Sequence, residues 1–169
     1  MIQLEYYPRE PQLDKRLAAI ATRVRPNAPL FDIGSDHAKL PAYLLRHGHR
    51  GEITISDVRE KPLLTAKARL GEGNAAFVLS NGFENLRFVS GADIIIAGMG
   101  GETIADIILG CPFLQSFTDN ERFLLQPMTQ QHIMLSRLAE CGFMVTDTEE
   151  VAVRDKHYTI YLMMKGATE

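Results

Sequence analysis

The sequence predicts an α/β fold built on a parallel β-sheet that helices cover on both faces. Short apolar runs alternate along the chain with stretches in which apolar residues recur at helical spacing. Strands that alternate with helices in this way are joined by crossover connections, which place neighbouring strands parallel. The runs are almost continuously apolar, as expected for strands that are buried on both faces.

The first element is an amphipathic helix at residues 11–25. Leu13, Leu17 and Ile20 recur at helical spacing, and Pro26 ends the pattern. The next apolar run, 28–33, leads through a Gly-Ser-Asp-His loop into a helical stretch at 39–47, which tolerates a proline in its first turn. These residues therefore predict helix, strand, tight loop and helix.

The same cycle of strand, loop and helix then repeats. Strands are expected at 51–57, 75–80, 93–97 and 122–126, with helices at 61–70, 103–109 and 130–141. Two further β-rich runs, 143–153 and 158–164, flank a charged turn and predict a terminal hairpin. No linker or internal repeat interrupts the pattern, so residues 1–169 are expected to form a single domain.

Composition limits the class of protein. The chain has 169 residues, of which 46% are hydrophobic and 23% charged, as in an ordinary soluble domain. Cys111 and Cys141 lie far apart, which argues against a zinc or disulfide scaffold and favours a reducing, cytoplasmic location. There is no signal pattern and no apolar run of the ~20 residues that a membrane helix needs. The net charge of −3 means that any basic, nucleic-acid-binding surface must be local.

The loop after the first strand is the first candidate site, because ligands of open α/β sheets bind beyond the carboxyl ends of the strands. Within residues 32–37, Gly34 permits a tight turn, and the following helix offers free N–H groups. The loop lacks the GxGxxG spacing of pyrophosphate sites, which lowers the expectation of NAD or FAD. Taken singly, Asp36 as a helix cap and His37 as a loop histidine are equally good interpretations.

Asp57 ends the second strand about 20 residues downstream, where an acidic side chain can accept hydrogen bonds from a ribose diol. Gly34 and Asp57 together indicate an adenosine ligand without a pyrophosphate. S-adenosyl-L-methionine meets this description, and Asp32 or Asp36 would offset its sulfonium and ammonium charges. Asn81-Gly82, after the third strand, could bind an adenine edge, although Asn-Gly is also a common turn.

The fourth and fifth strand ends are also unusual. Residues 98–101 read Gly-Met-Gly-Gly, which indicates either a sharp turn or close approach of a ligand, with Met99 lining an apolar slot. Gln126 precedes Pro127 and carries both a donor and an acceptor for a base edge. The methionines expected to fill the core are Met128, Met134, Met144, Met163 and Met164.

Several cations in the N-terminal helix are candidate contacts for a nucleic-acid backbone, namely Lys15, Arg16, Arg23 and Arg25. Arg16 and Arg23 are expected on one face of that helix. A solvated helix surface explains the same charges equally well.

Three motifs are long enough to compare with known families: DIGSDHAKLP at 32–41, IAGMGG at 96–101 and LQP at 125–127. They resemble the TrmK family of bacterial tRNA adenine-N1 methyltransferases, and the similarity extends over nearly the whole chain. The resemblance implies a class I methyltransferase fold, three-layered and Rossmann-like, with a seven-stranded, mostly parallel sheet whose last strand is antiparallel. It also implies S-adenosyl-L-methionine as donor and N1 of adenine 22 of tRNA as acceptor, and we expect no metal.

The resemblance assigns roles to the motif residues. Those implied to face the cofactor are Asp32, Gly34, Ser35, Asp36, His37, Asp57, Asn81, Gly82, Ala97 and Gly98. Those implied to shape the acceptor-base site are Gly98, Met99, Gln126 and Pro127. Because N1 of adenine becomes cationic on methylation, a nearby carboxylate would stabilise it, and Asp36 is our candidate.

The chain departs from the family pattern at two positions. Asn81 stands where Asp is usual, and Met128 stands where Asn is usual, so a polar group near the target base is replaced by a thioether. Family members also carry a helical C-terminal domain that helps to hold tRNA. We expect this chain to be a short form without that domain.

The leading hypothesis is a methyltransferase that binds tRNA transiently. A methyltransferase of the same fold acting on a small molecule or a protein is the first alternative, and turnover on purified tRNA separates the two. A non-catalytic module that retains the cofactor pocket is the second, and it would bind the cofactor without forming product. An NAD-dependent dehydrogenase is a more distant alternative.

Overall fold

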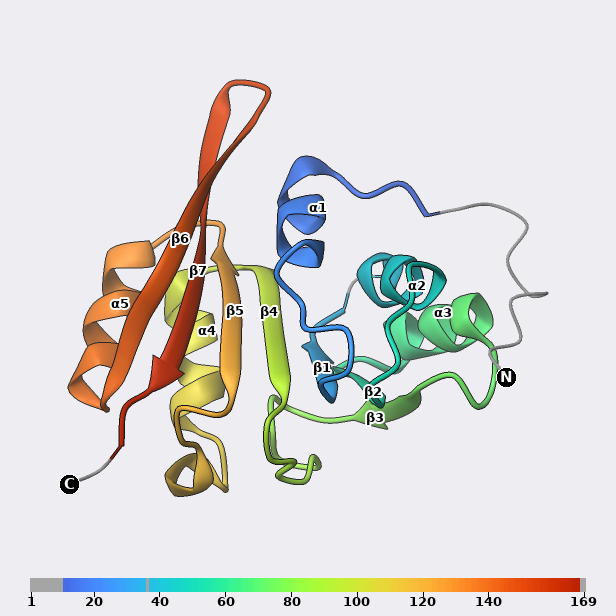
Figure 1. The fold of residues 1–169 in the computed structure, drawn as a ribbon, viewed down its shortest axis with the longest axis horizontal. Helices are drawn as coiled ribbons and strands as arrows, with labels where there is room; N and C mark the ends of the chain where they lie inside the picture. Colours follow the sequence, from blue (N-terminus) through green and yellow to red (C-terminus); the bar gives the residue numbers. More distant parts are fainter. Residues whose placement is uncertain (1–10, 36, 168–169) are drawn as a thin grey trace.

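The central sheet contains seven strands in the order β3-β2-β1-β4-β5-β7-β6 in the computed structural model, which describes residues 11–35 and 37–167 (Figure 1). The strands are β1 (Leu30–Ile33), β2 (Ile53–Asp57), β3 (Ala76–Leu79), β4 (Asp93–Met99), β5 (Arg122–Pro127), β6 (Phe143–Val153) and β7 (Lys156–Lys165). β1 to β5 pair in parallel, and β7 lies antiparallel between β5 and β6. The predicted parallel sheet, terminal hairpin and antiparallel last strand are confirmed.

Helices form a layer on each face of the sheet (Figure 1). On one face lie α1 (Lys15–Ala21), α2 (Lys39–Arg46) and α3 (Glu60–Leu70), and on the other lie α4 (Gly101–Leu109) and α5 (Gln131–Glu140). A short 3₁₀ turn, η2 (Leu114–Ser116), precedes β5. Successive residues of a central strand enter opposite layers: Ile95 packs with α1 to α3, whereas Ile94 and Ile96 pack with α4 and α5. This double burial explains why the strands are continuously apolar.

Helix α1 is shorter than the predicted helix at 11–25. It begins after Asp14, whose carboxylate accepts a hydrogen bond from the Leu17 N–H at 3.0 Å, and it ends at Ala21. The residues beyond it leave the helical path because the backbone N–H of Arg25 donates to Asp93 at 2.7 Å. A tertiary hydrogen bond therefore outweighs the helical periodicity that extends to Val24.

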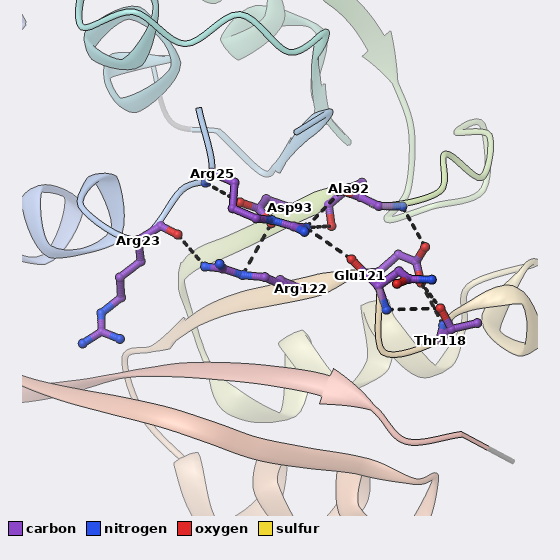
Figure 2. A network of polar contacts seen from close by, with 9 residues as sticks. Arg23, Arg25, Ala92, Asp93, Thr118, Glu121 and Arg122 are labelled. Carbon is purple, nitrogen blue, oxygen red and sulfur yellow. Dashed lines mark hydrogen bonds and ion pairs between the residues drawn. The ribbon is translucent and has the colours of Figure 1, made fainter. Parts of the chain in front are cut away.

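A polar network joins this connection to the amino ends of β4 and β5 (Figure 2). Asp93 is fully buried, and its Oδ1 accepts from Nε of Arg25 at 2.9 Å and lies 3.6 Å from Nε of Arg122. Arg122 also donates to the carbonyl oxygen of Arg23. Nearby, buried Glu121 accepts hydrogen bonds from two backbone N–H groups. The network thus anchors the segment between α1 and β1 at one end of the sheet.

At the opposite end, the β6–β7 hairpin extends past the parallel strands. Leu125 of β5 pairs with Tyr161 of β7. β5 ends soon after that pair, at Pro127, whereas β7 begins well before it, at Lys156. The hairpin therefore projects beyond the carboxyl ends of the parallel strands, next to α1 (Figure 1).

Candidate functional site

A cavity of about 990 Å³ opens at the carboxyl ends of the parallel strands. Each of the strands β1 to β5 contributes residues from its carboxyl end or from the loop that follows it. The first residues of α1 and α2 and one side of α4 complete the wall. The predicted site residues that border the cavity are Arg16, Asp32, Gly34, Ser35, Asp57, Asn81, Gly82, Ala97, Gly98, Met99 and Gln126. The fold therefore brings together residues that span most of the chain.

The other predicted site residues are placed differently. Asp36 lies outside the described residues, and the cavity wall in the described part of the chain does not include His37, Pro127, Lys15, Arg23 or Arg25. Arg23 pairs with Asp147 and Glu149 on β6. Arg25 pairs with buried Asp93, far from the cavity end of the sheet. Both of these guanidinium groups therefore have intramolecular carboxylate partners.

Asp32 is a buried carboxyl group in the cavity wall. It lies in β1, and burial raises its pKa to about 6, although a hydrogen bond from Ser35 acts in the opposite direction. Burial disfavours the ionised form of a carboxyl group, whereas a neighbouring positive charge favours it. The site is therefore suited to a ligand that carries positive charge near β1.

Asp57 and Val58 form a polar and an apolar surface side by side. Asp57 ends β2 and is 5% exposed, and its Oδ1 accepts the backbone N–H of Arg59 at 2.8 Å. Val58 also borders the cavity and is 64% exposed, although it is apolar. This pair can hold a hydroxylated sugar through the carboxylate and a flat apolar ring against the valine.

Gly34 is required by its conformation and by a close neighbour. Its φ is +71°, and a Cβ added there would lie 2.0 Å from Cε of Met99. The loop after β1 therefore packs directly against the end of β4, with Met99 in the wall as predicted.

The Gly-Met-Gly-Gly segment combines both interpretations offered by the sequence. Gly98 has a φ of +80° at a register shift between β4 and β5, and it borders the cavity. Gly101 begins α4, and a Cβ there would lie 2.3 Å from the carbonyl oxygen of Gln130. Gly101 thus serves helix packing, whereas Gly98 and Met99 border the cavity.

Gln126 defines the end of the cavity near α1. Its side chain is fully buried, and Nε2 donates to the carbonyl oxygen of Pro127 at 3.0 Å. Its Oε1 accepts a hydrogen bond from Nη1 of Arg16 at 3.0 Å. Arg16 also pairs with Asp14 at 2.7 Å. In Asp14, hydrogen bonds from Leu17 and Arg16 outweigh the opposing effect of burial and lower the pKa of the carboxyl group.

The prediction that Met128 belongs to the core is wrong. Its side chain is 37% exposed, borders the cavity, and lies with Sδ 2.9 Å from Nη1 of Arg16. Met144, predicted to be core as well, is also exposed, whereas Met134 and Met163 are buried in the core as predicted. The signal that distinguishes Met128 is its position directly after a strand end, which composition alone does not reveal.

Sequence reasoning missed the cavity residues that helices and their flanks contribute. These are Asp14, Leu17, Lys39, Leu40, Arg59, Thr103, Asp106, Ile107 and Gly110. The rule that ligands bind beyond strand ends directs attention to loops and says nothing of which helical residues face inward.

A model of the methyltransferase domain family matches residues 13–161. The tRNA (adenine(22)-N(1))-methyltransferase of Bacillus subtilis is 36% identical over 123 residues, which are 70% of this chain and 50% of that protein. By this match, the chain spans about half the length of that relative.

Two solved structures have closely similar folds. The B. subtilis m1A22 tRNA methyltransferase TrmK gives a TM-score of 0.83 at 28% identity, over 93% of this chain and 68% of that chain. Streptococcus pneumoniae Sp1610 in complex with S-adenosyl-L-methionine gives a TM-score of 0.81 at 30% identity, over 94% of this chain and 75% of that chain.

Proposed function

This chain belongs to the methyltransferase domain family and, within it, to the TrmK family, and we propose that it transfers a methyl group from S-adenosyl-L-methionine to N1 of an adenine in tRNA. The observation that carries the proposal is the large cavity in which the strand-end residues Asp32, Asp57 and Gln126 converge. Its volume of about 990 Å³ lies in the range that accommodates a small-molecule cofactor together with a substrate group.

The residues present fit the proposed cofactor. The Asp57 carboxylate would accept the ribose hydroxyls, and the exposed face of Val58 would cover the adenine ring. Buried Asp32 would offset the positive charge of the methionine part. That charge would in turn stabilise the ionised form of this desolvated carboxyl group. Gly34 leaves the backbone close to the ligand, and Asn81 offers an amide to the adenine edge.

The acceptor base would enter from the side of Gln126. The amide of Gln126 is fixed by its hydrogen bond to the Pro127 carbonyl, so Oε1 points toward Arg16 and the cavity. An adenine placed there would donate its exocyclic amine to Oε1 and present the neighbouring N1 lone pair to the cofactor. Met99 would pack against the ring from β4.

S-adenosyl-L-methionine supplies an activated methyl group when it is bound. N1 of adenine already has a free lone pair, so the protein needs no side-chain nucleophile and no base to remove a proton. Its residues act by aligning donor and acceptor and by excluding water, which is the main contribution expected for transfer from a cofactor. Within the described residues no cluster of His, Cys, Asp or Glu could hold a metal ion.

With tRNA as its substrate, the protein would act in the cytoplasm. Exposed Lys15 lies at the start of α1, near the cavity mouth, and would contact an RNA backbone. Among residues 11–35 and 37–167, no helix is long and apolar enough to cross a membrane.

The decisive experiment is a transfer assay with S-adenosyl-L-methionine labelled in its methyl group and total tRNA as acceptor, followed by mapping of the modified base. We expect label at N1 of an adenine in wild type and in Asp119→Asn, an exposed control outside the cavity, and loss of label in Asp57→Ala. Label on protein or on small molecules, but not on tRNA, would place the substrate in another class. Tight cofactor binding without any product would identify a non-catalytic module.

A further inference from the structure

We propose that Tyr158 is the stacking surface for the acceptor base and that Arg16 holds this position until the base displaces it. The inference rests on the proposed function and names the residues that complete its base-binding end.

Tyr158 lies on the part of β7 that projects beyond the parallel strands. The guanidinium carbon of Arg16 is 5.4 Å from the centroid of the Tyr158 ring. Arg16 borders the cavity, whereas Tyr158 is not part of its described wall. The guanidinium group thus separates the aromatic ring from Gln126 and the space above it.

The contacts of Arg16 match those that an adenine would make. A guanidinium group is planar, it donates N–H groups in its own plane, and its face stacks on aromatic rings. Adenine is planar, its exocyclic amine donates in the plane of the ring, and it gains a positive charge when N1 is methylated. Oε1 of Gln126, which now accepts from Nη1 of Arg16 at 3.0 Å, can accept from that amine instead.

The same geometry selects among bases. Gln126 Nε2 is engaged by the Pro127 carbonyl at 3.0 Å, so Oε1 is the atom left to face the incoming base. A carbonyl oxygen accepts a hydrogen bond from an exocyclic amine, but it repels the carbonyl oxygens of uracil and of the O6 edge of guanine. The site therefore favours an amine that adjoins a ring nitrogen with a free lone pair.

Displacement of Arg16 from Asp14 costs less free energy than disruption of the Arg25 ion pair would. The side chains of Arg16 and its partner Asp14 are 21% and 40% exposed, so water replaces much of their attraction. The partner of Arg25, in contrast, is completely buried. A base that leaves its stack in RNA loses stacking energy, and a new aromatic partner restores part of it.

The test measures binding of free adenosine to protein saturated with S-adenosylhomocysteine, which blocks the cofactor end, by saturation-transfer NMR. We expect Tyr158→Ala to weaken adenosine binding about 5- to 100-fold, as loss of one base–aromatic stack does, and Tyr158→Phe to retain it. Arg16→Ala and Arg16→Gln should strengthen adenosine binding about 10-fold, because the competing group is gone.

The controls are His157→Ala, an exposed neighbour on the same hairpin, and Lys67→Ala, an exposed cation in a surface ion pair with Glu72. Both should bind adenosine as wild type does. Unchanged adenosine binding in Tyr158→Ala, or no gain in both Arg16 variants, would overturn the proposal. Failure of wild type to bind S-adenosylhomocysteine would instead refute the proposed function, and calorimetry reports that separately.

Discussion

At the scale of single residues, the ionisation of Asp32 links the cavity to pH. Burial raises its pKa in the folded chain to about 6, from a usual value of 3.8. The folded chain therefore holds this proton more tightly than the unfolded chain does. The contribution to stability is complete below about pH 4 and is lost as the pH rises to about 6.

A cationic ligand reverses this preference. We expect the affinity for S-adenosyl-L-methionine to rise about 10-fold between pH 5 and pH 7, because at pH 5 the carboxyl group must first release its proton. Calorimetry at the two pH values measures the change. The rise should disappear in Asp32→Asn and should be absent for 5′-methylthioadenosine, which lacks both positive charges. A wild-type affinity that does not depend on pH would contradict this role of Asp32.

Asp57 provides a second test at this scale. Replacement by Ala should weaken S-adenosyl-L-methionine by ~1–3 kcal/mol, because the ribose hydroxyls would lose their acceptor when they leave water. Thermal unfolding of the unliganded variant checks that β2 remains intact. If the calorimetric affinity matched that of wild type, the ribose would have to lie elsewhere.

At the scale of elements, the sequence predicted strands better than helix ends. Apolar runs located β1, β2, β4 and β5, because strands that are buried between two helical layers are almost continuously apolar. β3 and β6 are largely exposed, and they were located by β-rich residues between turn signals. The end of α1 was predicted too late, since the hydrogen bond from Arg25 to Asp93 joins segments far apart in sequence. Arg23 and Arg25 likewise pair with carboxylates that are far away in the sequence. No local sequence pattern indicates these pairs.

The Asp93 network predicts a loss of stability without a loss of ligand binding. Asp93→Ala should lower the free energy of unfolding by ~3 kcal/mol, since it leaves the partners of a buried carboxylate without compensation. Urea unfolding measures this change. The folded variant should bind S-adenosyl-L-methionine as wild type does, because the network lies at the end of the sheet away from the cavity. Asp147→Ala, which removes an exposed partner of Arg23, should have only a marginal effect.

At the scale of the whole molecule, the net charge of −3 means that the proposed binding of tRNA would depend on a few local cations. Binding of tRNA should weaken as salt rises, because each neutralised phosphate releases counterions. Lys15→Ala should reduce the slope of log K against log[salt] by about one unit. Filter binding over a salt series gives the slope. An unchanged slope would mean that Lys15 does not contact the backbone.

Among the residues that border the cavity, those at the strand ends were predictable. Asp32, Gly34 and Asp57 are recognisable because a parallel sheet brings its carboxyl ends together whatever lies between them in the chain. Met128 follows a strand end in the same way, but the contact of Tyr158 with Arg16 was not predictable, because it depends on how the hairpin and α1 meet. Such contacts follow from packing rather than from motif or period.

The two ends of the segment that contains α1 are held with very different strength. After the last turn of α1, Arg25 forms an ion pair with a carboxylate that is inaccessible to water. In the first turn, Arg16 pairs with a carboxylate that is partly exposed. We therefore expect the first turn of α1 to be more mobile than the last turn. Under the proposed function, entry and exit of an RNA strand would need only a small local movement of the first turn, and the sheet beneath would remain rigid throughout a catalytic cycle.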